Sequence, residues 1–161
     1  SMTRLLRWMI LGALLGVLLL AAPPTARAAD PMTGKWELNV RNSLFDPGPP
    51  PKSGMRTQTV GADAISVTLD FVDADGQSRQ VQYAAKLDGK DYAVTGAPSG
   101  NMIWVKRVDA RTLEYAVKDG NKTTISGKLR VSEDGSELEV SSKGKDAKGE
   151  EFSDLMVFDK R

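Results

Sequence analysis

The sequence of 161 residues contains no cysteine and no histidine. Without cysteine the fold has no disulfides, so core packing and backbone hydrogen bonds must hold it together, and thioether lipidation of a lipobox cysteine is excluded. Without histidine it lacks the commonest general base, the usual metal ligand and the base of serine triads. We therefore expect no metal, no cofactor and no enzymatic activity.

Pairs of carboxylates are the remaining candidates for acid–base chemistry, and each pair has a simpler explanation. Asp73 and Asp75 flank the turn at Gly76, where Asp side chains cap the local backbone. Glu137 and Glu139 alternate along one strand, which is typical of a solvated face. The Asp73–Gly76 turn also lacks the later ligands of an EF-hand calcium loop. No catalytic residue is predicted.

The N-terminal 28 residues have the pattern of a secretory signal peptide. Arg4 and Arg7 precede an apolar run over residues 8–22, and small residues follow up to Ala28. The run is shorter than the roughly 20 residues that cross a bilayer, so cleavage after Ala28 is favoured over a retained anchor. Ser1, ahead of Met2, is interpreted as a cloning remnant. The predicted location is periplasmic or secreted.

The remaining residues, 29–161, have the length of one domain. Removal of residues 1–28 takes away three arginines and no acid, which changes the formal charge from +1 to −2. A near-neutral domain with both signs interspersed has no basic surface for nucleic acid and no polybasic patch for a membrane.

Turn sequences recur along this domain at the spacing of β-hairpins, ending at Gly76, Gly89, Gly100, Gly120, Gly135 and Gly149. The stretches between them are rich in β-branched and aromatic residues. Ten strands are predicted, at residues 35–40, 55–61, 64–73, 77–87, 90–95, 101–108, 111–118, 122–132, 136–144 and 150–159. The proline-rich segment 46–54 cannot join a regular ladder, so it is predicted to cross the body in an extended form, with Leu44 and Phe45 packed against the body.

Each central strand has one apolar face. Ile65, Val67 and Leu69, for example, alternate with Ser66 and Thr68. No amphipathic helix is available to cover these faces, so the sheet is predicted to close on itself. The fold class is therefore all-β, an antiparallel up-and-down meander of 8 to 10 strands closed into a barrel, with a two-sheet sandwich as the alternative.

Gly34-Lys35-Trp36 at the start of the first strand resembles the G-x-W signature of the calycin group, which comprises the lipocalins and fatty-acid-binding proteins. The last strand, residues 154–160, is similar in placement to that of the fatty-acid-binding proteins. The whole domain, with its DPGPPPKS, DADG and KLDGKDY segments, resembles small secreted bacterial lipocalin-like proteins that are largely uncharacterised. The resemblance implies a lipocalin-like barrel with Trp36 across its closed end.

The sequence departs from the fatty-acid-binding pattern in two places. The proline-rich segment replaces the two lid helices. Met156 and Phe158 stand where that family carries an Arg-x-Tyr pair for the ligand carboxylate. A neutral apolar ligand, or an unoccupied core, is therefore expected.

The residues predicted to line a ligand pocket share an apolar or aromatic side chain and an inward position: Trp36, Leu38, Phe71, Tyr83, Trp104, Tyr115, Met156 and Phe158. In the strand after Gly100 the inward pair is either Met102 with Trp104 or Ile103 with Val105. Arg107 or Lys106 would supply a polar anchor, unless both side chains extend to water.

Two functions remain open from the sequence. The first is a non-enzymatic extracytoplasmic barrel that binds a small hydrophobic ligand. The second is a protein-interaction module with a solid core, an inhibitor or accessory subunit of a periplasmic or secreted enzyme, contacting its partner through residues 46–54.

Overall fold

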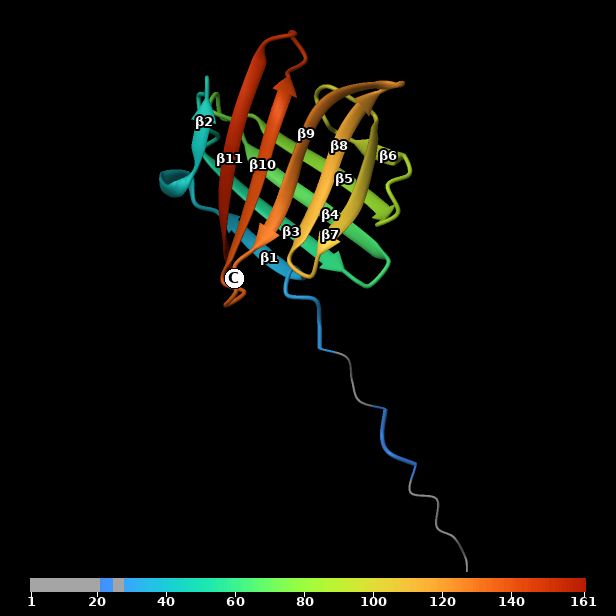
Figure 1. Cartoon of the computed structure of the whole chain (residues 1–161). Coiled ribbons are helices and arrows are strands. Elements are labelled where there is room, and N and C mark those ends of the chain that lie inside the picture. The colour runs from blue at the N-terminus through green and yellow to red at the C-terminus, as the bar shows by residue number, and fades with distance from the viewer. Residues whose placement is uncertain (1–20, 25–27) are drawn as a thin grey trace, which may run out of the picture.

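The computed structural model describes residues 21–24 and 28–161. Within them eleven strands form one antiparallel sheet that curls round on itself (Figure 1). The elements are β1 (Gly34–Leu38), η1 (Val40–Asn42), β2 (Leu44–Asp46), β3 (Ser53–Val60), β4 (Ala64–Val72), β5 (Ser78–Lys86), β6 (Tyr92–Thr95), β7 (Met102–Asp109), β8 (Thr112–Asp119), β9 (Lys122–Val131), β10 (Glu137–Lys145) and β11 (Glu151–Lys160).

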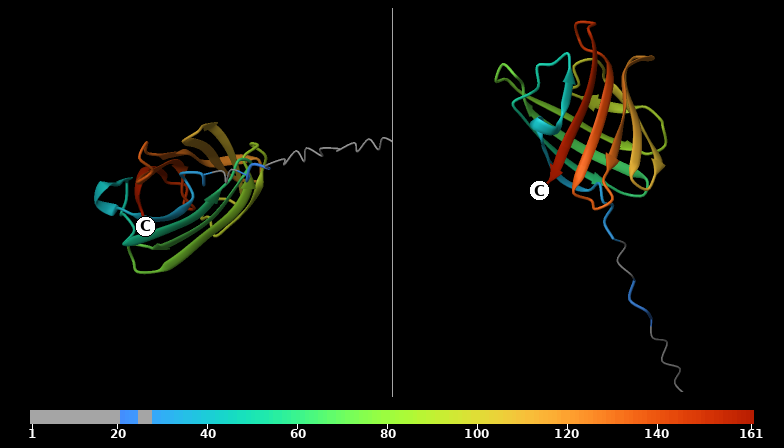
Figure 2. Two further views of the ribbon diagram at one scale, coloured as in Figure 1. Left: turned by 90° about the horizontal axis from the view of Figure 1, so that it is seen from below. Right: turned by 60° about the vertical axis from the view of Figure 1, so that its left-hand side comes forward.

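The sheet closes through its first and last strands. β1 pairs with β3 on one side and with β11 on the other, where Trp36 lies opposite Lys160 and Leu38 opposite Phe158. β1 and β3–β11 thus form a closed ten-strand meander, seen end-on in the left view of Figure 2. The predicted all-β, up-and-down barrel is confirmed, and the sandwich alternative is not what the chain forms.

All ten predicted strands are present, with ends that differ by no more than two residues. The apolar residues that alternate with polar ones in the sequence are the buried residues of these strands. Ile65 and Val67 are each 2% exposed, whereas Ser66 between them faces solvent. Most turn glycines adopt a positive φ, as at Gly76 and Gly135, which a hairpin turn requires and other residues rarely tolerate.

The segment after β1 differs from the prediction. Instead of a strand up to residue 40, the chain makes one 3-10 turn, η1, because the Asn39 side chain accepts a hydrogen bond from the Asn42 N–H at 3.1 Å. The chain then pairs with β11 again as β2. Phe45 packs against the core as expected, but Leu44 is 67% exposed, so its predicted packing role is wrong. Residues 47–52 connect β2 to β3.

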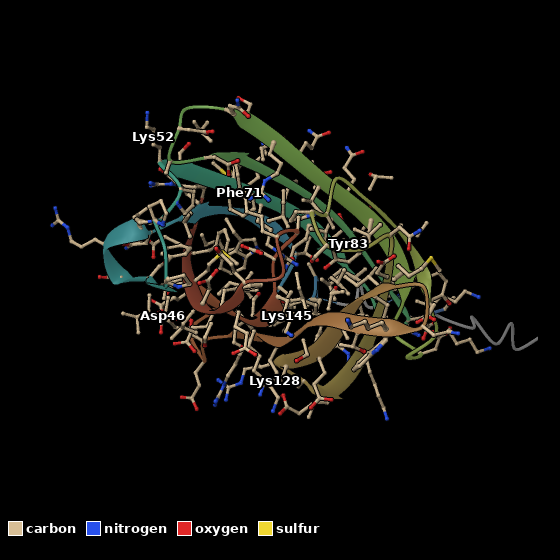
Figure 3. All side chains as sticks on the ribbon, turned by 90° about the horizontal axis from the view of Figure 1, so that it is seen from above. Asp46, Lys52, Phe71, Tyr83, Lys128 and Lys145 are labelled. Atoms are coloured by element: carbon tan, nitrogen blue, oxygen red, sulfur yellow. The ribbon has the colours of Figure 1, made fainter. Side chains whose placement is uncertain are left out.

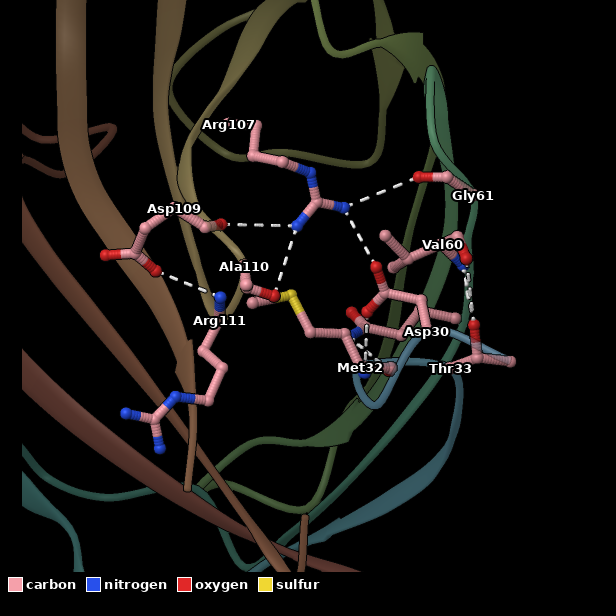
Figure 4. Close-up of polar contacts among 10 residues, drawn as sticks. Asp30, Met32, Thr33, Val60, Gly61, Arg107, Asp109, Ala110 and Arg111 are labelled. Carbon is pink, nitrogen blue, oxygen red and sulfur yellow. Dashed lines mark hydrogen bonds and ion pairs between the residues drawn. The ribbon is translucent and has the colours of Figure 1, made fainter. Parts of the chain in front are cut away.

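One end of the barrel is filled by side chains. Met32 is fully buried there, and its carbonyl accepts hydrogen bonds from the Trp36 indole at 3.0 Å and the Gln58 amide at 2.7 Å. Asp30, beside it, forms an ion pair of 2.9 Å with Arg107 (Figure 4). The residues just before β1 are thereby fixed across this closed end.

Among residues 21–24 and 28–161, no helix is long and apolar enough to cross a lipid bilayer. Most of the predicted signal segment, including residues 1–20 and 25–27, lies outside the described residues. Its cleavage and the extracytoplasmic location therefore stay predictions.

Candidate ligand cavity

The other half of the barrel encloses a cavity of about 590 Å³. This is within the range of roughly 300–1,000 Å³ that is usual for small-molecule sites. Its mouth is bordered by four connections: the proline-rich segment 47–52, the β4–β5 turn at Asp73–Asp75, the β6–β7 loop and the β10–β11 turn. Seen from above, Phe71 and Tyr83 project from their strands toward the interior, and Lys128 lies on the outside (Figure 3).

Four of the eight predicted pocket residues line this cavity: Phe71, Tyr83, Tyr115 and Met156. They come from strands on opposite sides of the ring, and the barrel brings them together. Apolar side chains from neighbouring strands complete the wall, namely Leu69, Val81, Val94, Ile103, Val117, Ile125, Leu129 and Val140. A binding role for the four stays a prediction.

Three other predicted pocket residues, Trp36, Leu38 and Phe158, belong to the closed end instead. Trp36 and Phe158 are fully buried and Leu38 is 7% exposed, and none of them borders the cavity. They form its packed floor. The position of Trp36 is the one that the G-x-W resemblance implied.

Trp104 is on the outer surface of the barrel, contrary to its predicted place in the pocket. The buried residues of β7 are Ile103 and Val105, which are 2% and 0% exposed. Trp104 lies opposite Ala116 in the β7–β8 register and lines a shallow outer hollow with Glu114 and Lys128. The sequence did not discriminate between the two faces because all four residues from Met102 to Val105 are apolar.

The polar group at the centre of the site is Arg56, on β3. It is only 3% exposed and borders the cavity. Its Nε donates to Gln58 Oε1 at 2.6 Å and its Nη2 donates to the Tyr83 hydroxyl at 3.1 Å. A neutral apolar ligand was expected, whereas this cavity carries a buried cation. Neither Arg107 nor Lys106 is the internal anchor, because Arg107 binds Asp30 at the closed end and Lys106 is exposed.

Arg56 has no anionic partner in the described part of the chain, where no carboxylate comes within 4.0 Å of it. A guanidinium has five N–H groups, and only two of those of Arg56 have a protein acceptor there. A buried cation is costly unless it is paired and hydrogen-bonded. The remaining N–H groups are therefore suited to an anionic group that enters from the cavity.

On the opposite wall, the Tyr115 side chain crosses β9 at Gly127. The two residues are opposite each other in the β8–β9 register, and Gly127 is in turn opposite Ser142. Since Gly127 has no side chain, the Tyr115 hydroxyl reaches β10, where it donates to the Ser141 carbonyl at 3.0 Å and contacts the Ser142 hydroxyl. Burial raises the pKa of Tyr115 to about 12, although the Ser142 hydrogen bond and the positive charge of Arg56 act in the lowering direction.

At the mouth, Arg79 lies over the Phe71 ring, with the guanidinium carbon 5.7 Å from the ring centroid. It also forms a 3.2 Å ion pair with Asp73. This second arginine is paired and 38% exposed, so it differs from Arg56 in having both a partner and access to water. The mouth also carries Asp75, Asp146 and Glu150, so this arginine gives the entrance no net positive charge.

A wider, more polar hollow of about 920 Å³ adjoins the rim of the barrel, between the β6–β7 loop and the β10–β11 turn. It has no buried charged group. Within the described ranges, no three potential metal-ligating side chains come together. The enclosed cavity is therefore the candidate site.

Arg56 and Gln58 were not identified from the sequence because both faces of β3 carry polar residues. Arg56, Gln58 and Val60 share one face, and Thr57 and Thr59 share the other. The one available signal was Val60, whose burial would have placed Arg56 inside with it.

No protein-family model matches the sequence, and no match is found among curated proteins. Among solved structures, the crystal structure of the zebrafish ileal bile acid-binding protein complexed with cholic acid is similar to this chain. The TM-score is 0.46 and the sequence identity 14%, over 81% of this chain and 98% of that protein. This likeness is too distant to support any inference about the cavity.

Proposed function

We propose that the protein binds a small amphipathic molecule inside the barrel, with the apolar part against the aliphatic and aromatic wall and an acidic head group at Arg56. The binding is non-enzymatic, and the site is extracytoplasmic if the N-terminal segment acts as a signal peptide. The observation that carries the proposal is the buried guanidinium of Arg56, which faces a mainly apolar cavity and has no carboxylate partner among the described residues.

The chemistry follows from the environment of Arg56. Guanidinium binds a carboxylate through two parallel hydrogen bonds, and such charge-assisted bonds are about twice as strong as neutral ones. Arg56 is only 3% exposed, which limits competition from water, and Gln58 and Tyr83 fix the orientation of the guanidinium. The sequence-based alternative, an interaction module with a solid core, requires a filled interior where this barrel has a cavity of about 590 Å³.

The proposal is tested by calorimetric titration of purified, delipidated protein with palmitate, its methyl ester and hexadecanol. We expect palmitate to bind at least about tenfold more tightly than the two neutral analogues, since a charge-assisted hydrogen bond contributes about 1.5–3 kcal/mol. Arg56→Met should remove most of this preference. Arg130→Met, which changes an exposed arginine on β9, is the matched control.

Three results would contradict the proposal: no binding of any of the three ligands, equal binding of acid and ester, or an unchanged preference in Arg56→Met. Circular dichroism of each variant establishes that it is folded. The comparison of acid with ester in the unmodified protein needs no variant and stands even if Arg56→Met fails to fold.

A further inference from the structure

Besides Arg56 and the charged residues of the mouth, one further charged side chain lines the cavity, on β11, which β1 separates from β3 in the ring. Asp154 of β11 lies between Ser142 of β10 and Phe45 of β2 in one row across the sheet. The same row continues through Gly127 to Tyr115. All five residues except the glycine border the cavity. A carboxylate therefore belongs to the same interior row as two hydroxyl groups.

The hydrogen-bonding capacity of Asp154 is largely unused. An ionised carboxylate has two oxygens that accept about four hydrogen bonds in total. In the described part of the chain Asp154 receives one, a 3.3 Å bond from the backbone N–H of Asp46, and it has no cationic partner. Burial and the nearby charge of Asp46 raise the pKa of Asp154 above its ordinary value of 3.8, although the Asp46 N–H acts against this. The half-buried carboxylate, which also borders the outer hollow at Trp104, thus has one protein donor and room for another.

The neighbouring hydroxyls do not supply a further donor. The Tyr115 hydroxyl is directed to Ser141 and Ser142, and no hydrogen bond joins Ser142 to Asp154. The hydroxyls are oriented by each other, which leaves Asp154 open toward the cavity.

Arg56 and Asp154 face the same space without forming an ion pair. Both side chains border the cavity that Tyr115 also lines, Arg56 from β3 and Asp154 from β11. An anion suits Arg56 and would be repelled by Asp154. A hydrogen-bond donor suits Asp154 and is of no use to Arg56. The two groups therefore select different parts of one ligand.

We infer that the natural ligand is an acid that carries a hydroxyl group on its apolar part, with the acid at Arg56 and the hydroxyl donating to Asp154. This inference rests on the proposed function and narrows it from amphipathic acids in general to hydroxylated ones. A plain hydrocarbon chain would leave the Asp154 oxygens facing apolar groups, which is unfavourable. A hydroxyl group on the ligand would donate a charge-assisted hydrogen bond to the Asp154 carboxylate, in place of the water that the ligand displaces.

The test compares palmitate with a positional series of hydroxypalmitates and with the matching methoxypalmitates, by calorimetry on the full chain. We expect at least one hydroxy isomer to bind about tenfold more tightly than palmitate and than its methoxy analogue, which keeps the oxygen but cannot donate. In Asp154→Leu this advantage should fall to within about twofold, and palmitate should bind at least as well as before. Glu151→Leu, an exposed position on β11 outside the cavity lining, is the control.

The inference is overturned if every hydroxy isomer binds like palmitate, if hydroxy and methoxy compounds bind alike, or if the advantage persists in Asp154→Leu. In each of these cases palmitate still binds and the proposed function stands. If no fatty acid binds at all, the proposed function fails and the inference fails with it. Asp154→Asn, which retains an acceptor oxygen at the same place, should keep part of the hydroxyl preference and serves if the leucine variant does not fold.

Discussion

Gly127 is a position at which one added methyl group should damage the barrel through a steric clash alone. A Cβ atom there would lie 1.8 Å from the Ser141 carbonyl oxygen and 3.0 Å from the Tyr115 ring. Carbon and oxygen normally approach to no less than about 3.3 Å. The β9 and β10 backbones would therefore have to separate by roughly 1.5 Å beside the Gly127–Ser142 pair.

The expected cost of Gly127→Ala combines two effects. Overpacking costs about 1–3 kcal/mol, and one or two weakened ladder hydrogen bonds cost about 1 kcal/mol each. A total of about 3 kcal/mol would lower the Tm of a domain of this size by roughly 10 °C. The assay is thermal unfolding followed by circular dichroism.

The matched control is Gly61→Ala, in the β3–β4 turn, where the nearest atom to an added Cβ is the Ala64 oxygen at 3.9 Å. This variant should change the Tm by no more than about 3 °C, because it clashes with nothing. Equal melting temperatures for the two variants would refute the close approach of β9 and β10 at Gly127. They would also refute the route by which Tyr115 reaches Ser142.

Three further predictions concern the floor and the wall of the cavity. Trp36→Phe should lower the free energy of unfolding by about 1–3 kcal/mol, because the buried Met32 carbonyl loses its hydrogen bond from the indole N–H. Urea titration measures this change, and an unchanged free energy of unfolding would mean that the bond contributes little. Phe158→Ala, in the packed floor, should lower the free energy of unfolding by about 3–5 kcal/mol. Phe71→Ala, beside the cavity, should lower it clearly less. Equal losses for the two variants would indicate that the half of the barrel around the cavity is also packed. Asp154→Asn should have a higher Tm than the unmodified protein at neutral pH. The pKa of Asp154 is raised in the folded state, so the unmodified protein loses stability as the pH rises through that pKa, and the uncharged asparagine does not. The difference should vanish in acid, where Asp154 is protonated, and a constant difference from acid to neutral pH would contradict its burial.

The strands were predictable because local signals agree with the tertiary structure. Alternation and turn glycines placed all ten barrel strands to within two residues. β2 was not predictable, since its three residues form a strand only because η1 returns the chain to β11. Asn39 caps that turn, and the Ser43 hydroxyl accepts from the Val157 N–H at 2.9 Å. The second of these contacts joins residues 114 positions apart, so no local periodic pattern indicates it.

The candidate site was half predictable for a related reason. Apolar side chains that alternate with polar ones identify their own inward face, which is why Phe71 and Tyr83 were placed correctly. A polar residue inside the barrel, such as Arg56 or Asp154, breaks the very pattern that identifies the interior. Such residues become visible only once closure of the ring assigns each strand its inner face.

The pairing of β1 with β11 brings both ends of the folded chain to the closed end, where the N–H of Arg161 donates to the Lys35 carbonyl at 2.9 Å. The right-hand view of Figure 2 shows the C-terminus and the start of β1 together there, away from the mouth. A label or a surface attachment at either end would leave ligand entry unobstructed. A circular permutant would join these ends through a short linker and open the chain in the β8–β9 turn. It should keep the whole ring of strand pairs. Its new termini would lie beside the mouth, where an attached label could report on ligand entry.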